Sequence, residues 1–341
     1  MVIAVIVGGV VLIALTATDL LLTVLHPTRS GPLSRTTMRT IWRVSLAAAT
    51  RLHREVIVSY AAPTMMLAQL VGWVLGLWLG FALVYAGHPD QLGYASPDES
   101  VAQGLPDALY LSGASLTTVG FGDLVAQTDL LRLLTVAESA GGLAVFGAAI
   151  AYVLAVYPRA SEIRVMAGEL ACVHNDHDAA ELIVHGGVSR LQALQRDLIQ
   201  LDESTQRFPI LYYFHSRDPD ASLTTAIHAA SLISLQLRFG IALNTLPSAR
   251  WHGCILDIAL TRVIDHFRKR YHPGGDSDGD WSSDHPEVDR RLADLRRAAS
   301  DVTGESAEDP PDRAALAGLL GRSHVFLSEL ERWHLYPHHP M

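Results

Sequence analysis

The chain has 341 residues, a net charge of −9 at pH 7 with histidine neutral, and 49% hydrophobic residues. Most of the negative charge lies after residue 157, which argues against nucleic-acid binding because such proteins present a basic surface. Two isolated cysteines, Cys172 and Cys254, do not make a disulfide framework and predict a reducing compartment. All the long apolar runs lie before residue 158, so we expect a membrane part followed by a water-soluble part.

Three apolar segments are long enough to cross a membrane, namely residues 2–25, 63–87 and 129–157, since a crossing takes about 20 helical residues. The first segment has neither a basic N-terminal stretch nor a convincing cleavage site, so we expect it to remain as a membrane span rather than to be removed as a signal peptide. It contains one charge, Asp19, for which we expect a tie to an arginine of the following loop.

The loops predict the orientation of the chain in the cell (plasma or inner) membrane. Residues 26–57 contain six arginines and one acid, whereas residues 88–107 contain four acids and no basic residue. Positive loops stay inside, so we expect the N-terminus outside and the C-terminus in the cytoplasm. Residues 34–53 predict either a helix on the inner leaflet or a plain linker helix. In a helix on the inner leaflet, the apolar side would be formed by Met38, Ile41, Trp42 and Leu46.

The segment between the second and third spans is too short to cross and return as two helices. It therefore enters and leaves from one side, and non-helical backbone at that depth is tolerated where it is buried in protein or lines a water-filled path. Pro106 and Asp107 predict the start of a short helix that ends near Leu116 or Thr117. The negative C-terminal end of that helix favours a cation.

The residues after this helix read Thr118-Val119-Gly120-Phe121-Gly122. Glycines at alternate positions allow successive carbonyls to turn to one side, and rings of carbonyls can replace the water shell of a cation. One chain supplies one strip of carbonyls, so a closed ring requires several chains.

The stretch "TTVGFGD" resembles the selectivity filter of potassium channels, and Gly142 lies 22 residues after Gly120, at the spacing of the inner-helix glycine hinge in that family. The resemblance covers residues 60–157 well, residues 1–59 weakly and the remainder not at all. It implies a prokaryotic-type channel with a single pore loop per chain, assembled as a homotetramer.

The resemblance also implies roles for single residues. Carbonyls of Thr118, Val119, Gly120 and Phe121 would bind the permeant K⁺, with Gly122 completing the ion-binding segment and the Thr118 hydroxyl adding the innermost ligands. Thr117, Asp123 and Tyr110 would support the filter. Two departures matter, because many channels have a polar residue where Ala114 stands and an aromatic pair where Tyr110-Leu111 stands. We therefore expect Tyr110 to be the residue that supports Asp123.

The third span has a periodic face, because residues spaced by 4, 3, 4 and 4 share one side of a helix: Ser139, Leu143, Phe146, Ile150 and Leu154. The resemblance implies that this face lines the pore, with Gly142 as the hinge, and its apolar part suits closure by dewetting. The alternative is that some of these side chains pack against neighbouring helices. Glu138 lies about 80–140° away from that face at 100° per residue, so we expect it to meet the base of the pore helix.

The fold class that follows is an all-α membrane protein in three parts: residues 1–57, with a transmembrane helix and a basic linker; residues 58–157, the pore domain; and residues 158–341, an all-α cytosolic domain. The expected cytosolic helices are residues 161–174, 177–205, 221–243, 247–271, 286–301 and 311–335. "IVHGGVSR" lacks the GxGxxG spacing of a Rossmann domain.

Three weak signals concern ligands of the cytosolic part. Asp276 to Glu287 resembles a calcium loop, but Trp281 stands where glycine is needed, so a solvated loop is favoured. Cys172, His174 and His177 suggest either a metal site or ordinary surface residues. Histidines are concentrated after residue 157 and suggest sensitivity to pH between about 6 and 8. We expect no metal site and no organic cofactor, and an unidentified cytosolic ligand stays possible.

The sequence thus predicts a potassium-selective channel without a voltage sensor, because the span before the pore domain carries no arginine or lysine. A non-selective cation leak and a pore-like receptor or scaffold that does not conduct are the alternatives. We find no nucleophile–base motif or phosphate loop, so an enzyme is not expected. The expected partners are further copies of the chain and the lipid bilayer.

Overall fold

A computed structural model describes residues 2–26, 30–52, 56–95, 104–216, 218–271, 281–305 and 312–334. Contacts divide the chain into two compact units, residues 1–51 with 60–157, and residues 52–59 with 158–341. Helices account for nearly all of the regular structure, which confirms the predicted all-α membrane fold.

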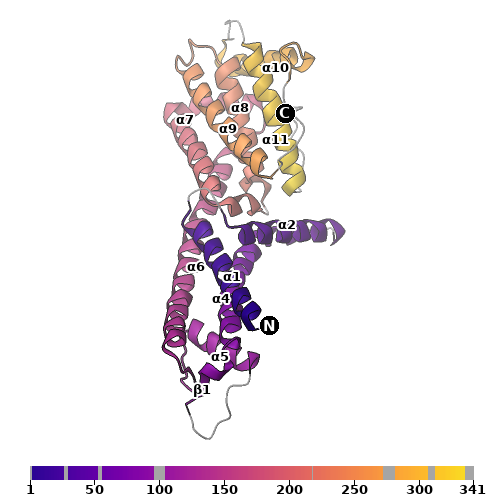
Figure 1. Ribbon diagram of the computed structural model, residues 1–341. Coiled ribbons are helices and arrows are strands. Elements are labelled where there is room, and N and C mark those ends of the chain that lie inside the picture. The colour runs from indigo at the N-terminus through magenta and orange to yellow at the C-terminus, as the bar shows by residue number, and fades with distance from the viewer. Residues whose placement is uncertain are drawn as a thin grey trace. The chain divides into compact units, whose positions relative to one another are not determined.

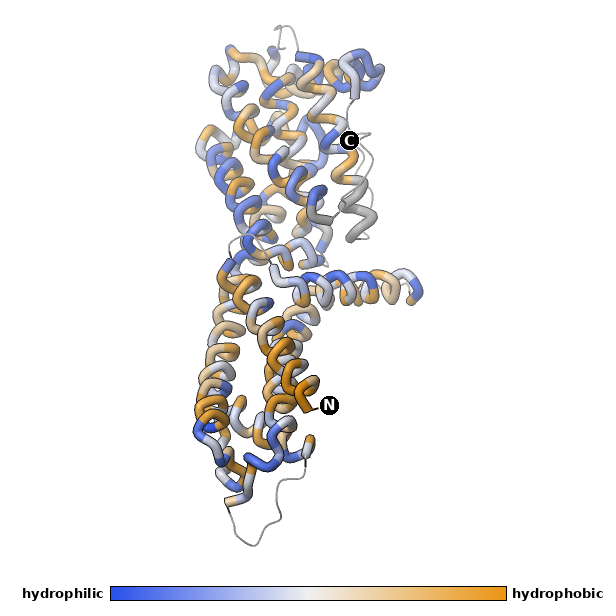
Figure 2. The backbone as a smooth tube through the Cα atoms, viewed as in Figure 1, coloured by the Kyte–Doolittle hydropathy of each residue, from blue (hydrophilic) through white to orange (hydrophobic). Residues whose placement is uncertain are grey.

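Three helices are long and apolar enough to cross a membrane: α1 (Val2–Val24), α4 (Ala61–Ala86) and α6 (Asp129–Leu170). Figure 2 shows α1 and α4 as hydrophobic along most of their length. The helix of the third predicted span does not end at residue 157, where the two units divide, but continues through Pro158 to Leu170. A proline removes one backbone hydrogen bond, and here the helix continues past that loss.

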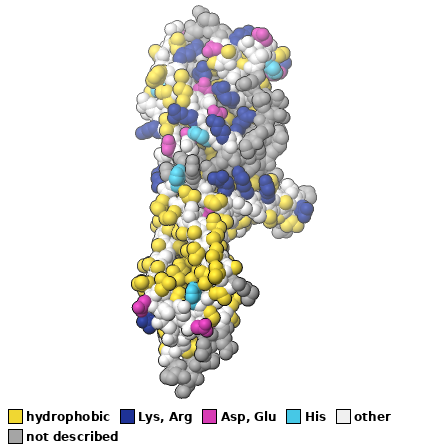
Figure 3. Space-filling view, viewed as in Figure 1, with side chains coloured by type: hydrophobic (Ala, Val, Ile, Leu, Met, Phe, Trp, Pro, Cys, Tyr) yellow, Lys and Arg dark blue, Asp and Glu magenta, His cyan; other side chains and the backbone are white. Residues whose placement is uncertain are grey.

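Small residues bring α1 and α4 together. A β carbon added at Gly80 would lie 2.7 Å from the Ile13 side chain, and one at Gly76 would lie 2.4 Å from the Thr16 hydroxyl oxygen. This close approach through glycines four residues apart is typical of packed membrane helices. Hydrophobic side chains cover much of the surface of this unit in Figure 3. On α4 the exposed stripe consists of Leu67, Val71, Leu75 and Leu79.

Helix α2 (Pro32–Leu52) runs across the ends of α1 and α4 (Figure 1), and a short α3 (Val56–Ser59) follows. Met38 and Trp42 are buried, as expected for the apolar side of the helix predicted at 34–53. The backbone tube in Figure 2 is hydrophilic along one side of α2 and hydrophobic along the other.

The pore segment contains α5 (Leu105–Leu116), close to the predicted bounds. Two strands that were not expected, β1 (Leu92–Tyr94) and β2 (Leu124–Ala126), pair antiparallel with Leu92 opposite Ala126. The short turn η1 (Pro89–Gln91) precedes β1. This small sheet joins the chain before α5 to the chain after the filter, so it fixes both ends of the re-entrant segment.

The C-terminal unit contains α7 (Asp176–Arg207), α8 (Leu223–Leu235), α9 (Ala249–Tyr271), α10 (Pro286–Thr303) and α11 (Arg313–His334). Short turns η2 (Pro209–Tyr213) and η3 (Pro219–Ala221) precede α8. Three predicted helices differ from the structure. Residues 161–174 do not form a helix of their own, because residues up to Leu170 belong to α6. Residues 177–205 are interrupted at Gly187, where φ is 75°, and residues 221–243 divide into α8 and the π-helical η4 (Gln236–Gly240).

The core of this unit is apolar and includes aromatic side chains. The Phe267 ring lies edge-on to Tyr212 and to Phe326, with ring centroids 4.9 and 5.1 Å apart. Helix α8 is buried along its whole length. A central buried helix surrounded by amphipathic ones explains why α7, α9 and α10 showed clear apolar periodicity in the sequence.

Candidate ion-conduction site

The filter segment follows the C-terminal end of α5 and has an unusual backbone. Thr118, Gly120 and Gly122 have φ values of 59°, 54° and 78°. Glycine adopts such angles readily, whereas they are strained for a β-branched threonine. The N–H groups of Val119 and Gly120 donate to the Ala114 carbonyl at 3.0 and 3.2 Å. Strained backbone held by its surroundings is typical of functional sites.

Side chains brace the filter from the direction of α5. The Tyr110 hydroxyl donates to Asp123 Oδ2 at 2.7 Å, and the Tyr110 and Phe121 rings are stacked with centroids 6.5 Å apart. The Thr117 hydroxyl donates to the Gly113 carbonyl at 2.6 Å. The structure thus brings together Tyr110 and Asp123, the pair that we expected to interact from sequence.

Replacing Tyr110 with phenylalanine is expected to change the decay of current during sustained opening. The variant keeps the ring and loses the hydrogen bond to Asp123, and about 1 kcal/mol for such a bond corresponds to roughly a fivefold change in rate. Tyr94→Phe is the control for the loss of a tyrosine hydroxyl, because the Tyr94 hydroxyl donates to Asp107 at 2.8 Å. Unchanged decay in patch-clamp recordings of Tyr110→Phe would contradict the proposed brace.

Helices α4 and α6 hold α5 from behind. The Trp78 indole donates to the Leu109 carbonyl at 2.9 Å, and the Ser139 hydroxyl donates to the Ser115 carbonyl at 2.8 Å. Gly142 touches the end of α5, since a β carbon there would lie 1.9 Å from the Leu116 carbonyl oxygen. Ser139 and Gly142, assigned from sequence to the pore lining and the hinge, therefore also contact the pore helix.

The other predicted pore-lining residues lie further along α6 and are exposed in this single chain. They are Leu143, Phe146, Ile150 and Leu154. Their exposed apolar side chains share one face of the helix, and their lining of a pore stays a prediction.

Glu138 is a buried carboxyl group between three helices. Its side chain contacts the Ser112 hydroxyl of α5, and its Oε2 accepts a hydrogen bond from the Tyr85 hydroxyl of α4 at 2.7 Å. The residue is 0% exposed. The contact with the pore helix was expected from the helical wheel, whereas Tyr85, 53 residues away, gave no signal in the sequence.

Asp19 is a buried carboxyl group, and its expected tie to an arginine stays a prediction because Arg29 and Arg54 lie outside the described residues. Among the described residues, the groups that contact its carboxylate are N–H and O–H donors. Leu33 N donates to Oδ1 at 2.8 Å, Trp73 Nε1 to Oδ2 at 3.0 Å and Gln69 Nε2 to Oδ2 at 3.3 Å. Ser34 donates through both its backbone N–H and its hydroxyl.

This arrangement places Asp19 at the N-terminal end of α2, where unpaired backbone N–H groups and the helix dipole favour a negative charge. Gly31 is required beside it, since a β carbon there would lie 1.9 Å from Asp19 Oδ1. Asp19 therefore fastens α2 to α1 and, through Trp73 and Gln69, to α4.

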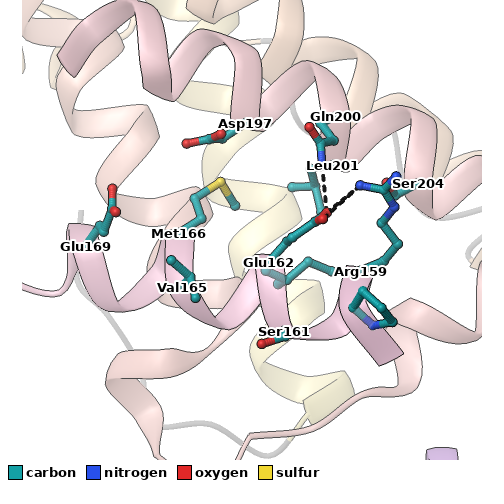
Figure 4. A pocket seen from close by; sticks show the side chains of 12 residues that line it. Arg159, Ser161, Glu162, Val165, Met166, Glu169, Asp197, Gln200, Leu201 and Ser204 are labelled. Carbon is teal, nitrogen blue, oxygen red and sulfur yellow. Dashed lines mark hydrogen bonds and ion pairs between the residues drawn. The ribbon is translucent and has the colours of Figure 1, made fainter. Parts of the chain in front are cut away.

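The C-terminal unit contains a cavity of about 510 Å³ between the last turns of α6 and α7 (Figure 4). The Glu162 carboxylate accepts from Arg159 at 2.8 Å and from Gln200 at 2.7 Å. Burial, followed by the nearby Glu169 carboxylate, raises the pKa of Asp197. The apolar part of the lining includes Ile163, Val165, Met166 and Leu201.

The weak ligand signals stay predictions. No group of three or more His, Cys, Asp or Glu side chains in the described part of the chain is arranged to hold a metal ion. Residues 276–280 of the calcium-like loop lie outside the described residues, and Glu287 is paired with Arg290 at 2.6 Å. Burial lowers the pKa of His215 to about 4, so that histidine stays neutral between pH 6 and 8.

Comparisons with known proteins agree with this geometry. Residues 70–158 match the family described as "Ion channel". The chain is 26% identical over 252 residues to "Uncharacterized membrane protein YdjJ" of Bacillus subtilis (strain 168), covering 71% of this chain and 72% of that protein. No solved structure matches the chain.

Proposed function

We propose that this protein, whose residues 70–158 match an ion-channel domain, is a potassium-selective, voltage-insensitive channel that conducts K⁺ passively. The observation that carries the proposal is the TVGFG backbone directly after the C-terminal end of α5, with left-handed φ angles at Thr118, Gly120 and Gly122. Alternating angles turn successive carbonyls to one side, and rings of such carbonyls replace the hydration shell of K⁺.

One chain carries one filter strip, so the proposed pore is a homotetramer around a shared axis. The exposure of the filter residues and of the apolar face of α6 in the single chain supports this assembly. In the proposed tetramer, Leu143, Phe146, Ile150 and Leu154 face the axis and close the pore by dewetting.

The C-terminal domain is the proposed regulator of that closure. Helix α6 is continuous from Asp129 to Leu170, so the helix that would line the pore also forms one wall of the 510 Å³ cavity. A ligand that binds one arrangement of α6 and α7 better than another would shift the gate.

In the proposed topology the N-terminus lies outside and the C-terminus in the cytoplasm. Helix α2 then lies at the inner surface of the cell membrane, with its arginines at the level of the lipid headgroups. The proposal requires K⁺ as the permeant ion and no organic cofactor. It assigns no nucleic-acid partner and no catalytic activity.

Flux measurements on the purified protein in liposomes test the function. We expect K⁺ efflux that barium blocks, with much lower Na⁺ flux and little dependence on voltage. Equal K⁺ and Na⁺ permeability would indicate a cation leak, and no flux of either ion would indicate a receptor or scaffold with a channel-like fold. Either result would overturn the proposal.

A further inference from the structure

Glu138 has a hydrogen-bonding environment that differs from that of Asp19, although both are buried carboxyl groups in helices that can span a membrane. We propose that Glu138 carries a proton in the folded channel and, in this form, acts as the positioning residue that holds α5 against α4 and α6. The inference deepens the proposed channel function, because α5 ends at the filter.

The first argument is a count of protons around Ser112. The Ser112 hydroxyl lies 2.9 Å from the Trp78 carbonyl oxygen and also contacts Glu138 Oε1. A serine hydroxyl has one proton and can donate once. If Glu138 were ionised, one of these two acceptors would face the serine oxygen without a proton between them.

A proton on Glu138 Oε1 resolves this conflict. Glu138 then donates to Ser112 Oγ, Ser112 donates to the Trp78 carbonyl, and Tyr85 donates to Glu138 Oε2 at 2.7 Å. Every contact in the chain then has one donor and one acceptor, as buried polar networks require.

The second argument is electrostatic. Glu138, Ser112 and Tyr85 are all 0% exposed, and no arginine, lysine or histidine is among the hydrogen-bond partners of Glu138 in the described residues. A charged carboxylate in such a place is costly, and it becomes neutral unless a cation or several donors stabilise it. Two hydroxyl groups, one of which also faces a carbonyl, do not provide that stabilisation.

Asp19 is a buried carboxyl group with a contrasting environment. Among the described residues, five groups donate to it: Leu33 N, Ser34 N, Ser34 Oγ, Gln69 Nε2 and Trp73 Nε1. The Ser34 hydroxyl can donate to Asp19 because Thr23, 2.8 Å away, can donate to Ser34. The two carboxyl groups therefore differ in how many donor groups surround them.

The neutral Glu138 joins three elements at one point, since Tyr85 lies in α4, Ser112 in α5 and Glu138 in α6. Ser112 is five residues before Thr117, where α5 ends and the filter begins. At position 114 the pore helix has alanine, so a polar side chain is missing there. The carboxyl contact to α5 comes instead from the inner helix.

The test compares Glu138→Gln with Glu138→Ala in liposomes. Glutamine has the shape of protonated glutamic acid, accepting from Tyr85 with its oxygen and donating to Ser112 with its nitrogen. We expect the K⁺ flux of Glu138→Gln to stay within about twofold of that of the parent protein. Its unfolding temperature should stay within a few degrees. Glu138→Ala should lower K⁺ flux by about fivefold or more, and Ser112→Ala should add little to that loss.

Infrared spectroscopy of the purified tetramer gives a readout that does not depend on conduction. We expect a carbonyl stretch of a protonated carboxylic acid near neutral pH, present in the parent protein and absent from Glu138→Gln. No such band, or Glu138→Gln as damaged as Glu138→Ala, would overturn the inference. If the parent protein shows the band but no K⁺ flux, the inference about the protonated Glu138 is supported and the proposed channel function is contradicted. The two failures are therefore distinguishable.

Discussion

Gly142→Ala is expected to abolish most K⁺ flux, because a β carbon at this position would lie 1.9 Å from the carbonyl oxygen of Leu116 and 2.9 Å from its carbonyl carbon. Leu116 is the last residue of α5, so the clash is with backbone and no side-chain rotation relieves it. Either α6 or the end of the pore helix must move. Overpacking of this kind costs about 1–3 kcal/mol even in cores that can adjust.

The neighbouring glycine provides a matched control. A β carbon added at Gly141 meets nothing within 4 Å, and Gly141→Ala makes the same chemical change in the same turn of α6. We expect Gly141→Ala to keep K⁺ flux and Gly142→Ala to lose at least tenfold, equivalent to about 1.4 kcal/mol. If Gly141→Ala and Gly142→Ala changed K⁺ flux equally, Gly142 would serve as a flexible joint or have no special role. The contact between Gly142 and α5 would then not explain why glycine stands at position 142.

The ends of the apolar helices could be predicted because they depend on local composition. α1 and α4 begin and end within two residues of the predicted spans, and α5 was located by Pro106 and Asp107. The filter was predicted from its own residues. In the C-terminal unit, apolar periodicity predicted α9, α10 and α11 to within two residues.

The features that could not be predicted depend on contacts between residues distant in the sequence, which periodicity does not encode. The continuation of α6 past residue 157 to Leu170 was likewise not evident from composition. Among the described residues, the partners of Asp19 and Glu138 lie up to 54 residues away. The pairing of β1 with β2 likewise joins segments on either side of the pore helix.

Asp19→Asn is expected to loosen α2 from the membrane helices and to destabilise the protein. Asparagine presents one acceptor oxygen and an NH₂ group, so donors such as Leu33 N, Ser34 N and Trp73 Nε1 lose an acceptor or face another donor. Leaving a buried donor unpaired costs about 1–3 kcal/mol, and several are affected here. We expect a loss on the order of 3 kcal/mol in unfolding free energy and faster hydrogen exchange of the Leu33 and Ser34 amides.

Asp129→Asn is the control for the same chemical change, because the Asp129 side chain is 98% exposed. Gly31→Ala tests the packing around Asp19 without changing Asp19 itself, because a β carbon at Gly31 would lie 1.9 Å from Asp19 Oδ1. Gly8→Ala is its control, because a β carbon at Gly8 meets nothing within 4 Å. We expect Gly31→Ala to reproduce the effects of Asp19→Asn and Gly8→Ala to have little effect. Equal thermal stability and amide exchange in Asp19→Asn and Asp129→Asn would mean that the five donors find other acceptors, and that α2 is held to α1 and α4 by its apolar side rather than by Asp19.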